Sequence, residues 1–106
     1  DATNSVKSFG YQAIEWVDPS FQVRWVVPRQ GNEVAQNLDL SREPRRQLTL
    51  SIARDLNQTL LSRTLSLAQG GKGFFAAVPL YLKVEGNGTV SDRFDGFLLG
   101  VFRIQT

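Results

Sequence analysis

The sequence predicts an α+β domain, in which an antiparallel sheet of about five strands carries one main helix packed on one face. Two observations lead to this prediction. Five segments have the length and apolar content of strands, and one segment repeats its apolar residues with the period of a helix. The order is two strands, the helix and three strands, which is typical of α+β folds. At 106 residues, the chain is long enough for one domain with a modest core.

The first two strands are predicted before Pro28. Residues 11–18 form the first strand or a short entry element, and Asp18-Pro19 is a turn signal. Residues 21–27 alternate between two faces, which predicts a half-buried strand. The more apolar of these faces holds Phe21, Val23, Trp25 and Val27. We expect Trp25 to lie in the core together with Trp16, and residues 1–10 to be a flexible N-terminal segment.

The main helix is predicted over residues 41–56. Ser41 is a suitable N-cap, and Pro44 falls in the first turn, where its missing N–H costs nothing. An apolar stripe with helical spacing is expected to face the core. It consists of Leu48, Ile52 and Leu56, with Ala53 beside them. Asn57 would end the helix, because Asn tolerates the left-handed conformation better than most residues.

Three strands joined by hairpins are predicted after the helix, over residues 59–67, 73–84 and 93–104. The first hairpin connection is residues 69–72, which contain Gly70-Gly71. The second is residues 85–91, around Asn87-Gly88.

Composition excludes several functions. The chain has no His and no Cys, so zinc sites, thiol catalysis and a Ser-His-Asp triad are impossible within it, and we expect no cofactor. A net charge of +2, with both signs interspersed, argues against nucleic acid as a partner. The carboxylates show no pairing for acid–base catalysis, so we expect a non-catalytic domain. They are Glu15, Glu33, Asp55, Asp92 and Asp95.

Several short pieces of the chain occur together in a recognisable order. They are FQVRWVVP at 21–28, Gly31-Asn32, Leu38-Asp39-Leu40, Arg45-Arg46, Ala53-Arg54-Asp55, Leu61-Ser62, Leu67, Gln69, GFFAAVPLY at 73–81 and DGFLLGVFR at 95–103. In this order they resemble the CHASE family, the extracellular sensory domain of receptor histidine kinases and cyclases. The resemblance covers about residues 11–104. One departure is Leu56-Asn57, where the family often has Thr-Gly; an Asn C-cap replaces Gly without threatening the fold.

The resemblance implies a single PAS-like sensor domain over residues 11–106. It also implies a fragment of a larger receptor, held outside the cell or in the periplasm by transmembrane helices and coupled to a cytoplasmic diguanylate cyclase or histidine kinase. A small-molecule ligand and a homodimer are implied in the same way.

Six ligand-binding residues are predicted. The resemblance implies that the Asp39 carboxylate accepts a hydrogen bond from a ligand N–H, and that Leu61 and Ser62 match pocket positions on the facing strand. Three further candidates share one face of their strand, where a small alanine would leave room for a ligand. They are Phe75, Ala77 and Pro79. The competing interpretations are a capping or turn role for Asp39 and ordinary core packing for the apolar residues.

Two alternatives remain open. Arg42, Arg45 and Arg46 form a basic cluster that is either a solvated face with local ion pairs, or a site for an anionic ligand or partner chain. The second alternative concerns the whole domain, which would be a structural or protein-interaction module with its pocket filled by its own side chains. A well-filled core around Ala77 would favour that second alternative.

Overall fold

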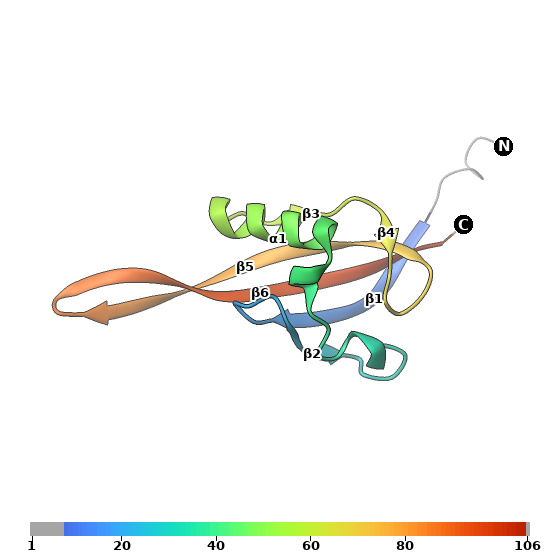
Figure 1. Cartoon of the computed structure of the whole chain (residues 1–106), viewed down its shortest axis with the longest axis horizontal. Coiled ribbons are helices and arrows are strands. Elements are labelled where there is room, and N and C mark those ends of the chain that lie inside the picture. The colour runs from blue at the N-terminus through green and yellow to red at the C-terminus, as the bar shows by residue number, and fades with distance from the viewer. Residues whose placement is uncertain (1–7, 106) are drawn as a thin grey trace.

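The computed structural model of the protein describes residues 8–105. It contains a six-stranded sheet in the order β2-β1-β6-β5-β3, with β4 also paired to β5. All the strand pairs are antiparallel. The helix α1 lies over one face of the sheet, and the β5–β6 hairpin extends far beyond the other elements (Figure 1). The α+β class with one main helix is confirmed. The sheet has six strands rather than about five because residues 59–67 form two short strands.

The elements follow one another as β1 (Ser8–Val17), β2 (Val23–Val27), η2 (Glu33–Ala35), η3 (Leu40–Arg42), α1 (Pro44–Leu56), β3 (Leu60–Leu61), β4 (Leu65–Ser66), β5 (Lys72–Gly86) and β6 (Thr89–Gln105). The strand β1 begins earlier than predicted. Its first residue, Ser8, is paired with Gln105, because β6 continues far enough to supply hydrogen-bonding partners there. The rest of the segment predicted to be flexible, residues 1–7, lies outside the described residues.

The long hairpin of β5 and β6 follows the turn chemistry that predicted it. Asn87 and Gly88 both have positive φ, at 52° and 78°, as a two-residue hairpin turn requires. The other connection, after β4, places Gly70 and Gly71 at φ 105° and 76°. The positions of both turns are confirmed, because the residues that adopt these angles at low cost are glycine and asparagine. The second connection is shorter than the predicted residues 85–91, because the strands pair up to Gly86 and Thr89.

The predicted alternation of residues 21–27 is right for Phe21 and Val23, which are buried, and wrong from Trp25 onward. Trp16 is opposite Trp25 and Val17 is opposite Val23, so Arg24 is an extra residue in β2. Such a bulge reverses the alternation, and it buries both Val23 and Val26 while Trp25 is left 40% exposed. The prediction that Trp25 lies in the core is therefore also wrong.

The helix begins later than predicted and turns a different side to the sheet. Ser41 belongs to η3, and α1 starts at Pro44, directly after its N-cap. The buried helix residues are Leu50 and Ala53. Ala53 is buried as predicted, but the rest of the predicted core stripe is exposed, at 58% for Leu48, 41% for Ile52 and 57% for Leu56. Small Ala53 lets the helix backbone lie close to β5, against which α1 packs. The end of the helix is as predicted, with Asn57 left-handed at φ 50°.

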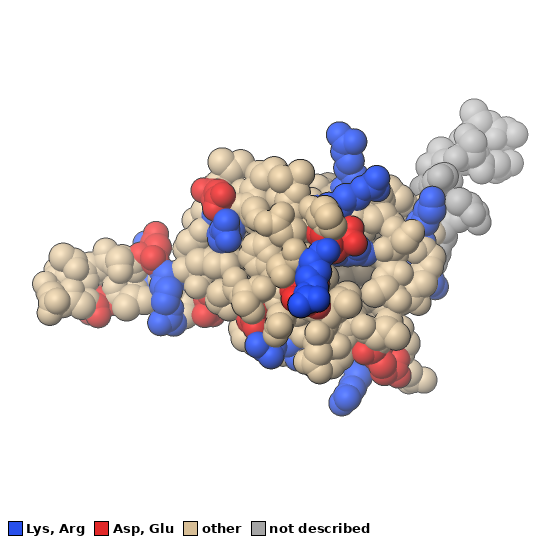
Figure 2. Space-filling model, in the orientation of Figure 1, with Lys and Arg blue, Asp and Glu red and all other residues tan. Residues whose placement is uncertain are grey.

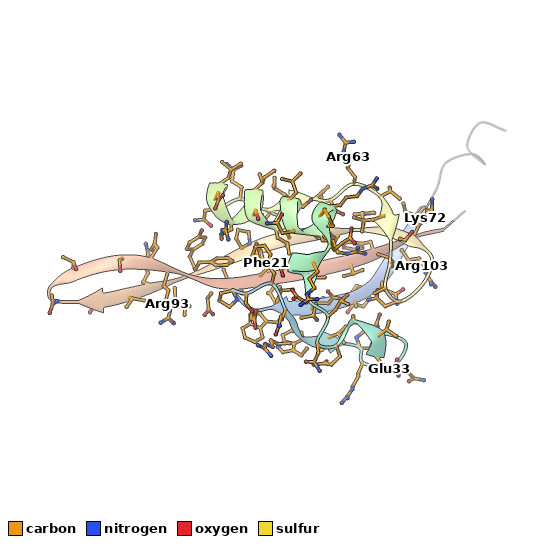
Figure 3. All side chains as sticks on the ribbon, viewed as in Figure 1. Phe21, Glu33, Arg63, Lys72, Arg93 and Arg103 are labelled. Carbon is orange, nitrogen blue, oxygen red and sulfur yellow. The ribbon has the colours of Figure 1, made fainter. Side chains whose placement is uncertain are left out.

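The core lies between α1 and the sheet. Phe21 is buried there (Figure 3), edge-on to the Phe97 ring of β6 at 5.5 Å between centroids. The Arg54 guanidinium of α1 lies over the Phe21 ring at 5.6 Å. The Tyr81 hydroxyl of β5 donates a hydrogen bond to the Arg54 carbonyl. These contacts fix the C-terminal half of α1 on the sheet, while the N-terminal half borders the site described below.

Gly96 marks the place where β6 bends out of the core, and it provides a test of the fold. Its φ is +104°, and a Cβ would lie 2.1 Å from the Val17 carbonyl oxygen. We expect Gly96→Ala to lose more than about 2 kcal/mol of unfolding free energy in urea denaturation. Gly86→Ala is the matched control, because no atom lies within 4 Å of a Cβ there. Equal unfolding free energies for the two variants would contradict this packing.

Candidate functional site

A hollow of about 640 Å³ between α1 and residues 63–65 is lined by none of the predicted site residues. An open cleft of about 470 Å³ is lined by one of them, Asp39. One wall is η3 with the start of α1, and the other is the segment that follows β4. Figure 2 shows this face hollowed near the start of α1, with basic and acidic side chains around the rim. The charged lining residues are Asp39, Arg42, Glu43 and Arg46. The apolar ones are Leu38, Leu40, Leu67 and Ala68. A cleft of this size and lining suits a small molecule.

The first wall is held in place by backbone hydrogen bonds to the start of β2. The Val23 N–H donates to the Leu38 carbonyl at 2.8 Å, and the Leu40 N–H donates to the Phe21 carbonyl at 2.8 Å. Arg46 then ties the two walls together, because its Nη2 donates to the Ser66 carbonyl at 2.6 Å. The cleft is thus bounded by segments far apart in the sequence.

Asp39 acts as a cap at the mouth of this cleft. Its Oδ1 accepts hydrogen bonds from the Ser41 backbone N–H at 3.0 Å and from the Ser41 hydroxyl at 2.6 Å. Its Oδ2 is 3.4 Å from Nε of Arg42. The Ser41 hydroxyl first, then the Ser41 N–H and Arg42, hold the pKa of Asp39 below its ordinary value. The predicted capping role is confirmed, and Asp39 also lines the cleft, so the two interpretations are compatible here.

A small inner chamber lies between the cleft and the sheet. Its volume is about 20 Å³, enough for one water-sized group. The chamber and the cleft share five lining residues, so the two hollows adjoin each other. They are Leu38, Leu40, Arg46, Leu67 and Ala68. Phe75, a predicted site residue, lines the chamber from β5 together with Leu99 and Val101 of β6.

Glu15 is the acidic residue of this chamber. It lies on β1 between Ala13 and Val17, and the three share the buried face of the strand, with Glu15 only 5% exposed. Gln69 Nε2 donates a hydrogen bond to Glu15 Oε2 at 3.3 Å. Burial raises the pKa of Glu15 from 4.5 to about 7, against the smaller lowering effects of Gln69 and of the positive charge on Arg46. A carboxyl group that changes charge near neutral pH therefore lies beneath the cleft.

Four of the six predicted site residues line neither hollow. Leu61 is 69% exposed. Ser62 is engaged with β5, because its Oγ accepts the Phe75 N–H at 2.9 Å. Ala77 is fully buried among core side chains, and Pro79 follows it on the same strand. The structure therefore brings Asp39 and Phe75 to the cleft and its inner chamber, while Leu61, Ser62, Ala77 and Pro79 lie elsewhere.

Sequence reasoning missed Glu15 and Gln69 as site residues, and it identified Arg46 only as part of a basic cluster. The period of two along β1 was the available signal for Glu15. It was obscured because the larger residues Ile14 and Trp16, which look like the core face, lie on the opposite face of the strand. Gln69 is 54 residues away from Glu15, and no local pattern links the two.

Within residues 8–105, the structure contains no cluster of three or more potential metal ligands. No helix in this part of the chain has the length and apolar content to cross a membrane.

Comparison with known proteins identifies the family. Residues 6–106 match the CHASE domain, so the chain belongs to the CHASE family of extracellular sensory domains. None of the curated proteins compared with the chain matches it. Among solved structures, the fold is similar to part of an extracellular ligand binding receptor from Desulfohalobium retbaense DSM5692, with a TM-score of 0.61 and 18% sequence identity. The match covers 86% of this chain and 15% of that receptor, so the chain spans a small part of the receptor's length.

The buried Glu15 carboxyl leads to a prediction about stability. Its pKa is raised on folding, so the folded protein keeps a proton that the unfolded chain releases between pH 4.5 and about pH 7. Stability should fall as the pH rises through this window, by about 3 kcal/mol from this group. Glu15→Gln removes the charge and should be the more stable protein at about pH 8, with the advantage shrinking toward pH 4.5.

Urea unfolding of both proteins across this pH range measures the difference, and subtraction cancels the other titrating groups. A difference that does not change with pH would contradict the burial of an ionisable Glu15.

Proposed function

We propose that this domain is the non-catalytic sensing module of a transmembrane receptor, and that a small molecule binds in the cleft between η3, the start of α1 and the segment after β4. Membership of the CHASE family gives the sensory role. The observation that supports the place of binding is the open cleft of about 470 Å³, which lies within the usual range for small-molecule sites. Asp39 at its mouth is suitably placed to accept a hydrogen bond from a ligand N–H.

The finer fold assignment belongs to the same proposal. The strand order β2-β1-β6-β5-β3, with the helices inserted between β2 and β3, agrees with a PAS-like sensor domain. In such a domain the ligand lies between the helical layer and the sheet, which is where the cleft and the inner chamber are found here. Ala77, Leu61, Ser62 and Pro79 stay predictions from the family resemblance alone.

Signalling would work through the segments that form the cleft. A ligand shifts a receptor only by the difference between its affinities for the two signalling states. The walls of the cleft are tied to β2, α1 and the β4–β5 turn, so a ligand between them would favour one spacing of these segments. In the intact receptor we propose that the change passes through transmembrane helices to a diguanylate cyclase or histidine kinase, within a homodimer.

A protein-interaction module is the second candidate, and two observations favour it. The core around Ala77 is well filled. The outward side of α1 presents Leu48, Ile52 and Leu56, all exposed. In this alternative, a partner protein rather than a small molecule would carry the signal.

A thermal-shift screen separates the two candidates. The domain would be tested with adenine derivatives, amino acids, organic acids, amines and indoles. A ligand at about a hundred times its dissociation constant adds roughly 2.7 kcal/mol, which raises the melting temperature by on the order of 10 °C. We expect at least one such shift, and we expect it to be lost in Ala68→Trp, because Ala68 is exposed and lines the cleft.

Ser91→Trp, on the exposed hairpin far from the cleft, is the matched control and should keep the shift. A shift retained in Ala68→Trp would place the ligand elsewhere. The absence of any shift across the screen would favour the interaction module.

A further inference from the structure

The inner chamber contains the strongest unassigned chemical feature of the molecule. A buried carboxyl group, that of Glu15, meets a space of about 20 Å³ that is otherwise surrounded mostly by apolar side chains. Among residues 8–105, the other polar side chains in the lining are those of Gln69 and Arg46. Such a space admits one compact group, of the size of a water molecule or an ammonium.

The hydrogen bonding of Glu15 is incomplete for a carboxylate. Among the described residues, its one hydrogen bond comes from Gln69, at 3.3 Å, which is longer than the common N–H···O distance. The Arg46 guanidinium acts on Glu15 through its charge, while its Nη2 is held by the Ser66 carbonyl. An ionised carboxylate has about four acceptor positions, and a buried one is normally paired with a cation. The Glu15 carboxylate can therefore accept further hydrogen bonds from a small, positively charged donor.

We propose that the inner chamber receives the protonated amine of the ligand, which donates hydrogen bonds to Glu15 while the apolar body of the ligand lies in the outer cleft. The inference rests on the proposed sensing function and names the ligand class. Rotation of the Gln69 amide would present its oxygen to the same ammonium group, since a primary ammonium has three donors. Leu40 and Leu67, which line both hollows, would contact the first carbons of the ligand body.

The charges around Glu15 make binding sensitive to pH with a defined sign. The α1 helix contributes Arg46, the rim contributes Asp39, Arg42 and Glu43, and β5 and β6 contribute only the non-titrating Phe75, Leu99 and Val101. Burial raises the pKa of Glu15 to about 7. An amine that needs the carboxylate should therefore bind about ten times more weakly at about pH 6 than at about pH 8, because the proton competes with it. A ligand that accepts a hydrogen bond from protonated Glu15 would show the opposite trend.

Isothermal titration calorimetry with shape-matched probes tests the inference. Phenethylamine carries the ammonium, 2-phenylethanol and 3-phenylpropionate replace it with a neutral and an anionic group, and L-phenylalanine adds a carboxylate that Arg46 could bind. Phenethylamine stays protonated across this range, since alkylamines have pKa values of about 10. We expect the two amines to bind and the other two probes to bind at least about tenfold more weakly, as a single lost charge pair implies.

Glu15→Gln should weaken amine binding by at least about tenfold and abolish its pH dependence. Asp92→Asn, on the exposed hairpin, should leave both unchanged. Circular dichroism checks that the variants fold, and the pH dependence of the wild-type protein tests the inference without any variant.

Preferred binding of the alcohol or the propionate, amine binding unaffected by Glu15→Gln, or no amine binding would overturn the inference. The proposed function is judged separately, by whether any compound in the thermal-shift screen binds the cleft. Tighter binding of L-phenylalanine than of phenethylamine would support the inference and add Arg46 to the site.

Discussion

The pairing of β6 on both of its edges is the constraint on which the rest of the structure depends. β6 is bonded to β1 along one edge and to β5 along the other, so these three strands share one twisted surface. The helical layer packs on one side of that surface, and the core exists only where it does. Asp95, next to Gly96, is an extra residue in the register with β5. Tyr81 and Phe94, the first pair beyond this bulge, still contact α1 and the core, and the hairpin then continues as two strands alone. The boundary between the packed domain and the projecting arm therefore lies just past the bulge.

Local chemistry made much of this fold predictable. Asn87-Gly88, Gly70-Gly71 and Asn57 each need a backbone conformation that few residues adopt cheaply, and each ended an element where expected. The faces of the elements were harder to predict. One extra residue, Arg24, inverted the predicted face of β2 from Trp25 onward, and α1 buries Leu50 beside Ala53 rather than Leu48, Ile52 and Leu56. Tertiary packing decides which face is buried, and it produces no periodic pattern of apolar residues from which that face could be predicted.

The residues of the site also fall into those predictable from the local sequence and those brought together by tertiary packing. Asp39 caps η3 through its neighbour Ser41, so a local pattern was sufficient to predict its structural role. Glu15 and Gln69 meet only because β1 and the turn after β4 are brought together through β5 and β6. The family resemblance directed attention to Leu61 and Ser62, whereas the cleft is bounded by η3, the start of α1 and the segment after β4.

The burial of Glu15 is best understood as a functional cost. An apolar residue between Ala13 and Val17 would fill the chamber and avoid the net penalty of ionising a buried carboxyl group, about 3 kcal/mol for a pKa raised from 4.5 to about 7. Natural proteins retain such local losses where a site needs them. In an unliganded domain, the carboxyl group relieves the penalty by taking up a proton. A ligand ammonium would relieve it as well, by bonding to Glu15 of β1 and to Gln69 in the turn after β4. Ligand affinity and the spacing of these segments would then be coupled, which is what a sensor requires.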